Sequence, residues 1–239
     1  QRRLAHVARR YYLEDQKQSD IARELIRAGG GFIAAPSANT SGRPSPTMAQ
    51  HVEEDLDGKI DMILDGGTVE IGVESTILDM TVSPPMLLRP GAVTKEMLEE
   101  LIGPIAVDAA SISADSSKPP KAPGMKYRHY APKADLSIVE GPVELVIEAI
   151  NGMAAERIAQ GYKVGIIGTE ESRDRYRQGI VKSIGTREDE ATIASHLYAI
   201  LREFDHEEVD YIYSESFARG GIGNAIMNRL LKAAGHHVI

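Results

Sequence analysis

The spacing of apolar residues divides the chain into two regions of different regularity. From about residue 134 onward, short apolar runs alternate with stretches of helical periodicity. The pattern predicts strands over 134–141, 163–169, 180–186 and 209–216, and helices over 143–161, 171–178, 190–204 and 223–235. This alternation is typical of a parallel sheet with helices on both faces.

The first region is less regular. Two helices are predicted within residues 1–28, with Ser19 as the N-cap of the second, and Thr47 and Thr94 are each placed to cap a later helix. The predicted helices cover 48–56 and 95–103, and the predicted strands cover 31–35, 59–67, 73–81 and 85–91. We expect the carboxylates of Glu53, Glu54 and Asp55 to face solvent.

A change of composition separates the two regions. Residues 108–132 are rich in Ser, Pro and Lys and have little apolar periodicity. Such a segment is typical of an extended connection between domains. The chain therefore reads as two α/β domains joined by a linker.

Composition and charge exclude several functional classes. A chain of 239 residues with 42% hydrophobic content can bury a core in one or two domains. A net charge of −8 without a dominant basic tract argues against electrostatic binding of nucleic acid or of an anionic membrane. The absence of cysteine excludes disulfides and thiolate chemistry and suits a reducing compartment. With no apolar run near the ~18 residues of a membrane span and no signal-peptide pattern, we expect a cytoplasmic protein.

The first candidate for chemistry is the loop that follows the predicted strand at 31–35. Its sequence, "AAPSANTSGRPSPT", supplies hydroxyl and amide groups from Ser37, Asn39 and Ser45, the guanidinium of Arg43, and three prolines that stiffen it. In open α/β sheets, ligands bind at the carboxyl ends of strands, and these groups suit phosphates and carboxylates. Ordinary turn formation explains the same composition, so the composition of the loop alone does not distinguish a ligand-binding site from a turn.

Two more motifs lie at predicted strands. In "GVESTILD", Ser75 lacks the second glycine of a G-x-S-x-G elbow and any well-spaced His and Asp partners, so we interpret it as a binding hydroxyl rather than a nucleophile. Arg89 ends a strand directly before Pro90-Gly91, where it either pairs with a phosphate or remains a surface arginine at a turn. No catalytic side chain is identified.

The linker carries the densest motif. Lys126, Tyr127, Arg128, His129 and Tyr130 alternate cations with aromatic rings, which suits the phosphates and base of a nucleotide. His129 has no second histidine or carboxylate at ligand spacing, so no metal site is predicted.

Five segments in order carry a resemblance to a known family. These are "PSANTSGRPSPT", "HVEEDLDGKIDMILDGG", "GVESTILD", "LLRPGAVT" and "APGMKYRHYAPKA". Together, over roughly residues 23–239, they resemble the long form of L-threonylcarbamoyladenylate synthase. The resemblance implies a YrdC-like α/β domain with a twisted mixed sheet at 23–107, a linker at 108–132 and a smaller Rossmann-like parallel-sheet domain at 133–239.

The resemblance also implies an activity and a set of site residues. Such enzymes combine L-threonine, bicarbonate and ATP, with Mg²⁺ expected on the phosphates, to give threonylcarbamoyl-AMP and pyrophosphate. Partner proteins then transfer the threonylcarbamoyl group to adenosine 37 of tRNAs. By this resemblance the residues that contact ATP are Ser37, Asn39, Ser45, Arg89 and Tyr127, and the residues that line the threonine pocket are Ala35 and Ser75.

The similarity has a limit at the N-terminal end. Members of the family begin with about half of the YrdC-like domain, and nothing before Arg23 matches that half. Residues 1–22 instead resemble the start of a helix-turn-helix regulator. We therefore expect an incomplete first domain with unpaired strand edges and an uncovered apolar face, and whether such a chain is active stays open.

Two other functions also stay open. One is a non-catalytic nucleotide-binding or regulatory module that keeps the linker and the Rossmann-like domain. The other is a DNA-binding regulator led by residues 1–28. The lack of a recognition helix and the acidic charge count against the latter, so no stable DNA binding is expected.

Overall fold

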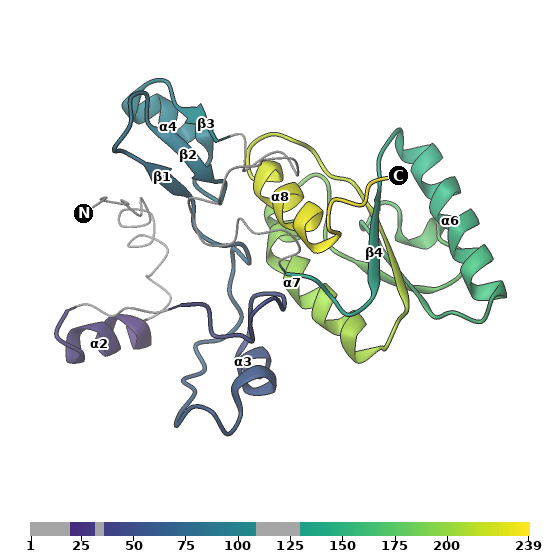
Figure 1. Cartoon of the computed structure of the whole chain (residues 1–239), viewed down its shortest axis with the longest axis horizontal. Helices are drawn as coiled ribbons and strands as arrows, with labels where there is room; N and C mark the ends of the chain where they lie inside the picture. The colour runs from purple at the N-terminus through teal and green to yellow at the C-terminus, as the bar shows by residue number, and fades with distance from the viewer. Residues whose placement is uncertain (1–19, 32–35, 109–129) are drawn as a thin grey trace.

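The computed structural model describes residues 20–31, 36–108 and 130–239 (Figure 1). The first region contains α2 (Asp20–Ala28), α3 (Ala49–Leu56), β1 (Ile77–Asp79), β2 (Met86–Arg89), α4 (Lys95–Ile102) and β3 (Ala106–Val107). The C-terminal domain contains β4 (Asp135–Val139), α6 (Val143–Ala159), β5 (Val164–Gly168), the 3₁₀ turn η2 (Arg173–Arg175), β6 (Ile180–Ser183), α7 (Glu190–His206), β7 (Tyr211–Glu215) and α8 (Gly223–Ala233). Among the helices described, none combines the length and the apolar character of a transmembrane segment.

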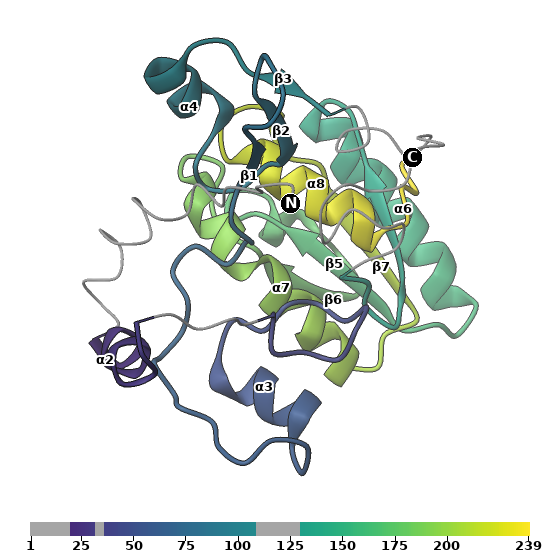
Figure 2. The same ribbon diagram turned by 60° about the vertical axis from the view of Figure 1, so that its left-hand side comes forward.

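The C-terminal domain is the parallel α/β unit that its pattern predicts. Its strands lie in the order β4-β7-β5-β6, and every pairing is parallel. Successive strand residues enter separate cores: Ile166 packs with α6 on one face, and Ile167 packs with α7 and α8 on the other. Because both faces are covered, the strands carry nearly continuous apolar runs. Figure 2 shows the helices on the two sides of this sheet.

One predicted helix of this domain is wrong. Residues 171–178 form only the 3₁₀ turn η2. The Ser172 hydroxyl and the Tyr176 hydroxyl both donate to the buried carboxylate of Glu215, at the end of β7. These long-range bonds hold the segment against the sheet edge, which outweighs its local helical spacing.

The first region forms a small mixed sheet, as the family resemblance implies. β2 pairs antiparallel with β1 and parallel with β3. Its core consists of two small clusters, one formed by Ile77 and Leu88 and the other centred on Leu78 and Leu87. The Thr94 cap is confirmed, because its hydroxyl accepts from the Met97 amide.

Several other predictions for the first region are wrong. Residues 59–67 form no strand, and the strand predicted at 73–81 is limited to β1. Within the described part of the chain no strand lies beside 59–67, and Ile60, Met62 and Leu64 are 41%, 71% and 50% exposed. These three large apolar side chains are therefore in contact with water.

The cap of α3 also differs from its prediction. Met48, not Thr47, is the N-cap residue and makes no side-chain cap bond. The Thr47 amide instead donates to the Nδ1 atom of His51. Ser19 and most of the strand predicted at 31–35 lie outside the described residues.

The two units pack against each other along α7 and α8. In Figures 1 and 2, α3 lies beside α7 and the three-stranded sheet lies beside α8. Gly72 has a φ of +68°, and a Cβ there would stand 2.4 Å from the carbonyl oxygen of Ala194 on α7. Val73 packs on the core of the C-terminal domain. Glycine at position 72 therefore permits the close approach of the chain to α7.

Candidate functional site

The carboxylate of Glu74 lies at the centre of the contact between the two units. Its Oε1 atom accepts from the Ser45 hydroxyl at 2.7 Å and from the Tyr198 hydroxyl at 3.0 Å. Its Oε2 atom accepts from the Arg229 Nε at 2.9 Å. Ser45 belongs to the hydroxyl-rich loop, whereas Tyr198 and Arg229 belong to α7 and α8. One side chain thus joins the loop to the C-terminal domain.

Ser75 and Arg89 meet next to this carboxylate. The Arg89 Nε donates to the Ser75 carbonyl oxygen at 3.0 Å, and an Nη atom lies 3.4 Å from the Ser75 hydroxyl. Arg89 ends β2, is 9% exposed and is held against the segment that leads into β1. The arrangement presents a guanidinium and a hydroxyl from adjacent chain segments.

Gly91 makes this approach feasible. A Cβ at this position would lie 2.5 Å from the Thr76 amide and 2.7 Å from the Glu74 carbonyl oxygen. The Arg229 guanidinium also donates to the Pro90 carbonyl at 2.6 Å and to the Glu74 carbonyl at 3.1 Å. Arg229 therefore holds both strand-end segments at once.

A second buried arginine reaches the loop from α7. The Arg202 guanidinium donates to the Pro44 carbonyl at 2.7 and 3.1 Å and to the Asp55 carboxylate at 2.8 Å. Asp55 also accepts from Arg43 and from the Thr40 amide. The expectation that Asp55 faces solvent is wrong, because two arginines and a loop amide surround it and its side chain is fully buried.

The electrostatics of the cluster follow from burial and from its arginines. Burial would raise the pKa of Glu74, but the Arg229 guanidinium and the Ser45 hydroxyl outweigh it and lower that pKa to about 2. Burial and the charges of Arg229 and Arg89 lower the pKa of Lys232 to about 8. Cationic groups from α8 and β2 thus surround a single buried carboxylate, a charge balance suited to an anionic ligand.

The Tyr130 ring packs against the ring of Tyr198. The two rings lie 5.1 Å apart, and Tyr130 is 2% exposed. Burial, followed by the charge of Glu74, raises the Tyr130 pKa to about 12. Tyr130 keeps its proton at neutral pH.

The structure brings some of the predicted site residues together. Ser45, Ser75 and Arg89 converge around Glu74. The Asn39 amide instead donates to the carbonyls of Thr40 and Arg43 and so braces the loop. Ser37 is exposed, and no described residue bonds it to the group around Glu74. Ala35 and Tyr127 lie outside the described residues.

The residues of the C-terminal domain that hold this site were missed from sequence. A signal was present, because Arg202 and Arg229 each stand on the apolar stripe of a predicted helix, where a charge demands a buried partner. For Arg229 that stripe includes Ile226 and Leu230. The identity of the partner cannot be read from that spacing.

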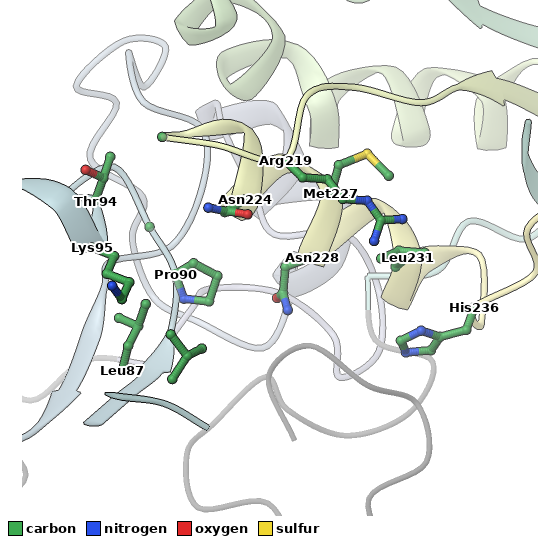
Figure 3. A pocket seen from close by; sticks show the side chains of 13 residues that line it. Leu87, Pro90, Thr94, Lys95, Arg219, Asn224, Met227, Asn228, Leu231 and His236 are labelled. Carbon is green, nitrogen blue, oxygen red and sulfur yellow. The ribbon is translucent and has the colours of Figure 1, made fainter. Parts of the chain in front are cut away.

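A small cavity lies beside this cluster, between β2 and α8 (Figure 3). Leu87, Pro90 and Lys95 line one wall, and residues such as Asn224 and Asn228 line the other. Its volume of about 160 Å³ is well below the ~300–1,000 Å³ typical of ligand pockets for larger molecules. The cavity is therefore too small to hold a nucleotide by itself.

No protein-built metal site is present in the described segments. Nowhere in them do three histidines or carboxylates come within reach of one ion. The described residues therefore do not fit a metal held by protein ligands alone.

Two family models match this chain, and they divide it between residues 91 and 93, ahead of the linker expected at 108–132. A family model described as "Threonylcarbamoyl-AMP synthase, C-terminal domain" matches residues 93–235. A second, described as "Telomere recombination", matches residues 17–91. The two matches meet close to the end of β2.

Curated relatives are similar over most of this chain. The threonylcarbamoyl-AMP synthase of Bacillus subtilis is 51% identical over 219 residues, which are 92% of this chain and 62% of that protein. The threonylcarbamoyl-AMP synthase of Pyrococcus abyssi is 46% identical and is covered to 63%. The chain thus spans under two thirds of the length of these relatives.

A solved structure is also similar. The crystal structure of P. abyssi Sua5 complexed with L-threonine has a TM-score of 0.84 and 44% sequence identity, and the match covers 92% of this chain and 63% of that one. The TM-score and the identity together show that the two chains share a fold over the matched part.

Proposed function

This chain belongs to the threonylcarbamoyl-AMP synthase family, and we propose on that premise that it forms part of an enzyme that makes threonylcarbamoyl-AMP and pyrophosphate from L-threonine, bicarbonate and ATP. The observation that carries the proposal is the convergence of Ser45, Ser75 and Arg89 around Glu74. Three segments far apart in sequence meet there beside a cationic cluster. The enzyme is then a nucleotidyltransferase.

The reaction requires positioning more than a nucleophilic side chain. The threonine amine attacks the carbon of bicarbonate, with loss of water, to form a carbamate. A carbamate oxygen then attacks the α-phosphorus of ATP, the bond to the β-phosphate oxygen breaks, and pyrophosphate leaves. Charge builds up on the phosphate oxygens, where fixed cations and hydrogen-bond donors stabilise it.

The proposed roles follow this need. We assign ATP contacts to Ser37, Asn39, Ser45, Arg89 and Tyr127, and the threonine pocket to Ala35 and Ser75. The position of Arg89 beside the Ser75 hydroxyl supports a shared site, in which the two substrates lie next to each other. The Asn39 side-chain amide also stabilises the loop by donating to the Arg43 carbonyl oxygen.

Mg²⁺ has no protein-built site among the described residues. The expected ion would therefore bind through the phosphates of ATP, and none of the roles assigned to this chain's residues depends on it. The threonylcarbamoyl product would pass to proteins that modify adenosine 37 of tRNA. We place this chemistry in the cytoplasm, since a chain without cysteine suits a reducing compartment.

A nucleotide-binding module without turnover is the second candidate. One observation favours it: Ile60, Met62 and Leu64, in the region that carries the loop, are 41%, 71% and 50% exposed, so this region is only loosely packed around the cluster. Such a chain would bind ATP through the same cluster but would not complete the reaction.

Calorimetry with the 239-residue chain tests the proposal. We expect ATP to bind, and we expect L-threonine to strengthen that binding because the two ligands share a site. Arg89→Gln should weaken ATP binding, whereas Arg175→Gln, which alters an exposed ion pair far from the site, should not. No ATP binding by the unaltered chain would contradict the proposal.

Turnover distinguishes the two candidates. Release of pyrophosphate that requires both L-threonine and bicarbonate supports the synthase. ATP binding without such release supports the module.

A further inference from the structure

We propose that the C-terminal domain positions the hydroxyl-rich loop that contains Ser45. Tyr198 and Arg229 hold the Glu74 carboxylate, and Glu74 in turn holds the Ser45 hydroxyl. The inference rests on the proposed function for the role of Ser45. It adds two positioning residues that come from the other domain.

The first support is the way in which the loop is anchored. The Arg202 guanidinium donates twice to the Pro44 carbonyl, and the Ser45 hydroxyl donates to Glu74. Adjacent loop residues are therefore fixed through the backbone and through a side chain. Both anchors lead to helices of the C-terminal domain, the first directly and the second through Glu74.

The second support is the dependence of Glu74 on that domain. Three side chains donate to its carboxylate, and two of them, Tyr198 and Arg229, are fully buried residues of α7 and α8. Without these donors a largely buried carboxylate would keep only the Ser45 hydroxyl, and a buried charge without its partners is strongly unfavourable. The carboxylate would turn toward water, and Ser45 would lose its fixed orientation.

The orientation of Ser45 determines what it offers a ligand. A serine hydroxyl has a single hydrogen, and here that hydrogen points to Glu74. The oxygen lone pairs remain for a donor on the ligand, such as a ribose hydroxyl or an adenine N–H group. The contact to Glu74 thus makes Ser45 an acceptor rather than a phosphate-binding donor.

Buried ion pairs also occur in contacts that only stabilise two domains against each other. Disrupting such a contact would lower the free energy of unfolding without changing how ordered the loop is. The experiment therefore needs a readout in the loop and a matched control outside it.

Hydrogen–deuterium exchange of the full 239-residue chain without nucleotide gives that readout. The Thr40, Arg43 and Thr47 amides are hydrogen-bonded and report on loop order. We expect Tyr198→Phe to speed their exchange about tenfold, the change that corresponds to loss of one hydrogen bond to a charged group. Arg229→Lys should speed it further.

Tyr176→Phe is the matched control. The Tyr176 hydroxyl donates to the buried Glu215 carboxylate at 2.7 Å, in the same domain, and the Tyr176 ring packs in the core under α6 rather than in the core of α7 and α8. The Tyr176→Phe substitution removes a bond of the same kind, from a tyrosine hydroxyl to a buried carboxylate. The exchange rates of the loop amides should equal those of the unaltered chain.

ATP titration of the same variants separates this inference from the proposed function. We expect Tyr198→Phe to raise the Kd for ATP about tenfold and Tyr176→Phe to leave it unchanged. Unchanged loop exchange in folded Tyr198→Phe and Arg229→Lys proteins would overturn the positioning role. A loop that responds in a chain that binds no ATP would support positioning and count against the proposed function.

Discussion

The four-stranded sheet and the three-stranded sheet differ in how their faces are covered. In the C-terminal domain, adjacent residues such as Ile166 and Ile167 enter separate cores on opposite faces. In the first region, the buried apolar residues of the sheet fall into two small clusters. The large apolar side chains at 60–64 are instead in contact with water.

The comparison shows that the candidate site lies on the region with the smaller core. Its loop is held by Arg202 and, through Glu74, by Arg229 of the C-terminal domain. Binding loops are commonly drawn from parts of low local stability, because they must adapt to a ligand. Here a stable domain supplies the fixed points that the loop lacks.

Limited proteolysis should give the largest difference between the two regions. We expect cleavage within residues 57–72, which lack regular structure and expose apolar side chains, at least about a hundredfold faster than cleavage within 133–239. Mass spectrometry of the time course would identify the sites. Early loss of the C-terminal half, with 23–105 left intact, would reverse the comparison.

Arg202→Met tests the link between the regions. Removing this cation leaves the buried Asp55 carboxylate with Arg43 as its remaining cationic partner, and breaking a buried pair costs about 3–5 kcal/mol. Urea unfolding followed by circular dichroism would measure the loss. The double variant Arg202→Met/Asp55→Leu should recover part of the stability, because no carboxylate then remains buried; a double variant as unstable as the single one would show that packing, not charge, holds the contact.

The fold was predictable where local and global preferences agree. The β4, β5 and β7 strands are buried on both faces, so their continuous apolar runs identify them from sequence. The helix predicted at 171–178 fails because Ser172 and Tyr176 bond to Glu215, some 40 residues away. The strand predicted at 59–67 fails because strand formation needs a neighbour to pair with.

The candidate site was predictable only in part, for a related reason. Ser75 and Arg89 were identified because polar groups at strand ends commonly face ligands. Asp55 was misread as solvent-facing because its partner Arg202 lies 147 residues further along the chain. Such a pairing depends on how the two domains dock, which periodicity within a helix cannot specify.

The smallest expected effect concerns the pH dependence contributed by Glu74. Its pKa falls from an ordinary 4.5 to about 2 in the folded chain. Above pH 4.5 the carboxylate is charged in both states, and its contribution to stability is fully present. As the pH falls from 4.5 to about 2, only the unfolded state takes up the proton, so stability is lost by roughly 3 kcal/mol at most.

Glu74→Gln isolates that contribution from other acidic groups. Burial would raise the pKa of Asp55 but Arg202 lowers it, and the pKa of Glu171 is lowered to about 2 by the Thr186 hydroxyl, so the unaltered chain loses stability in acid for several reasons. The glutamine variant should start less stable at pH 7 and lose less on acidification. Urea unfolding at pH 7, 4.5 and 3 would measure both slopes. If the free energy of unfolding changed equally with pH in both proteins, Glu74 would have an ordinary pKa. The contacts of its carboxylate with Arg229 and Ser45, which join the first region to the C-terminal domain, would then not hold it as described.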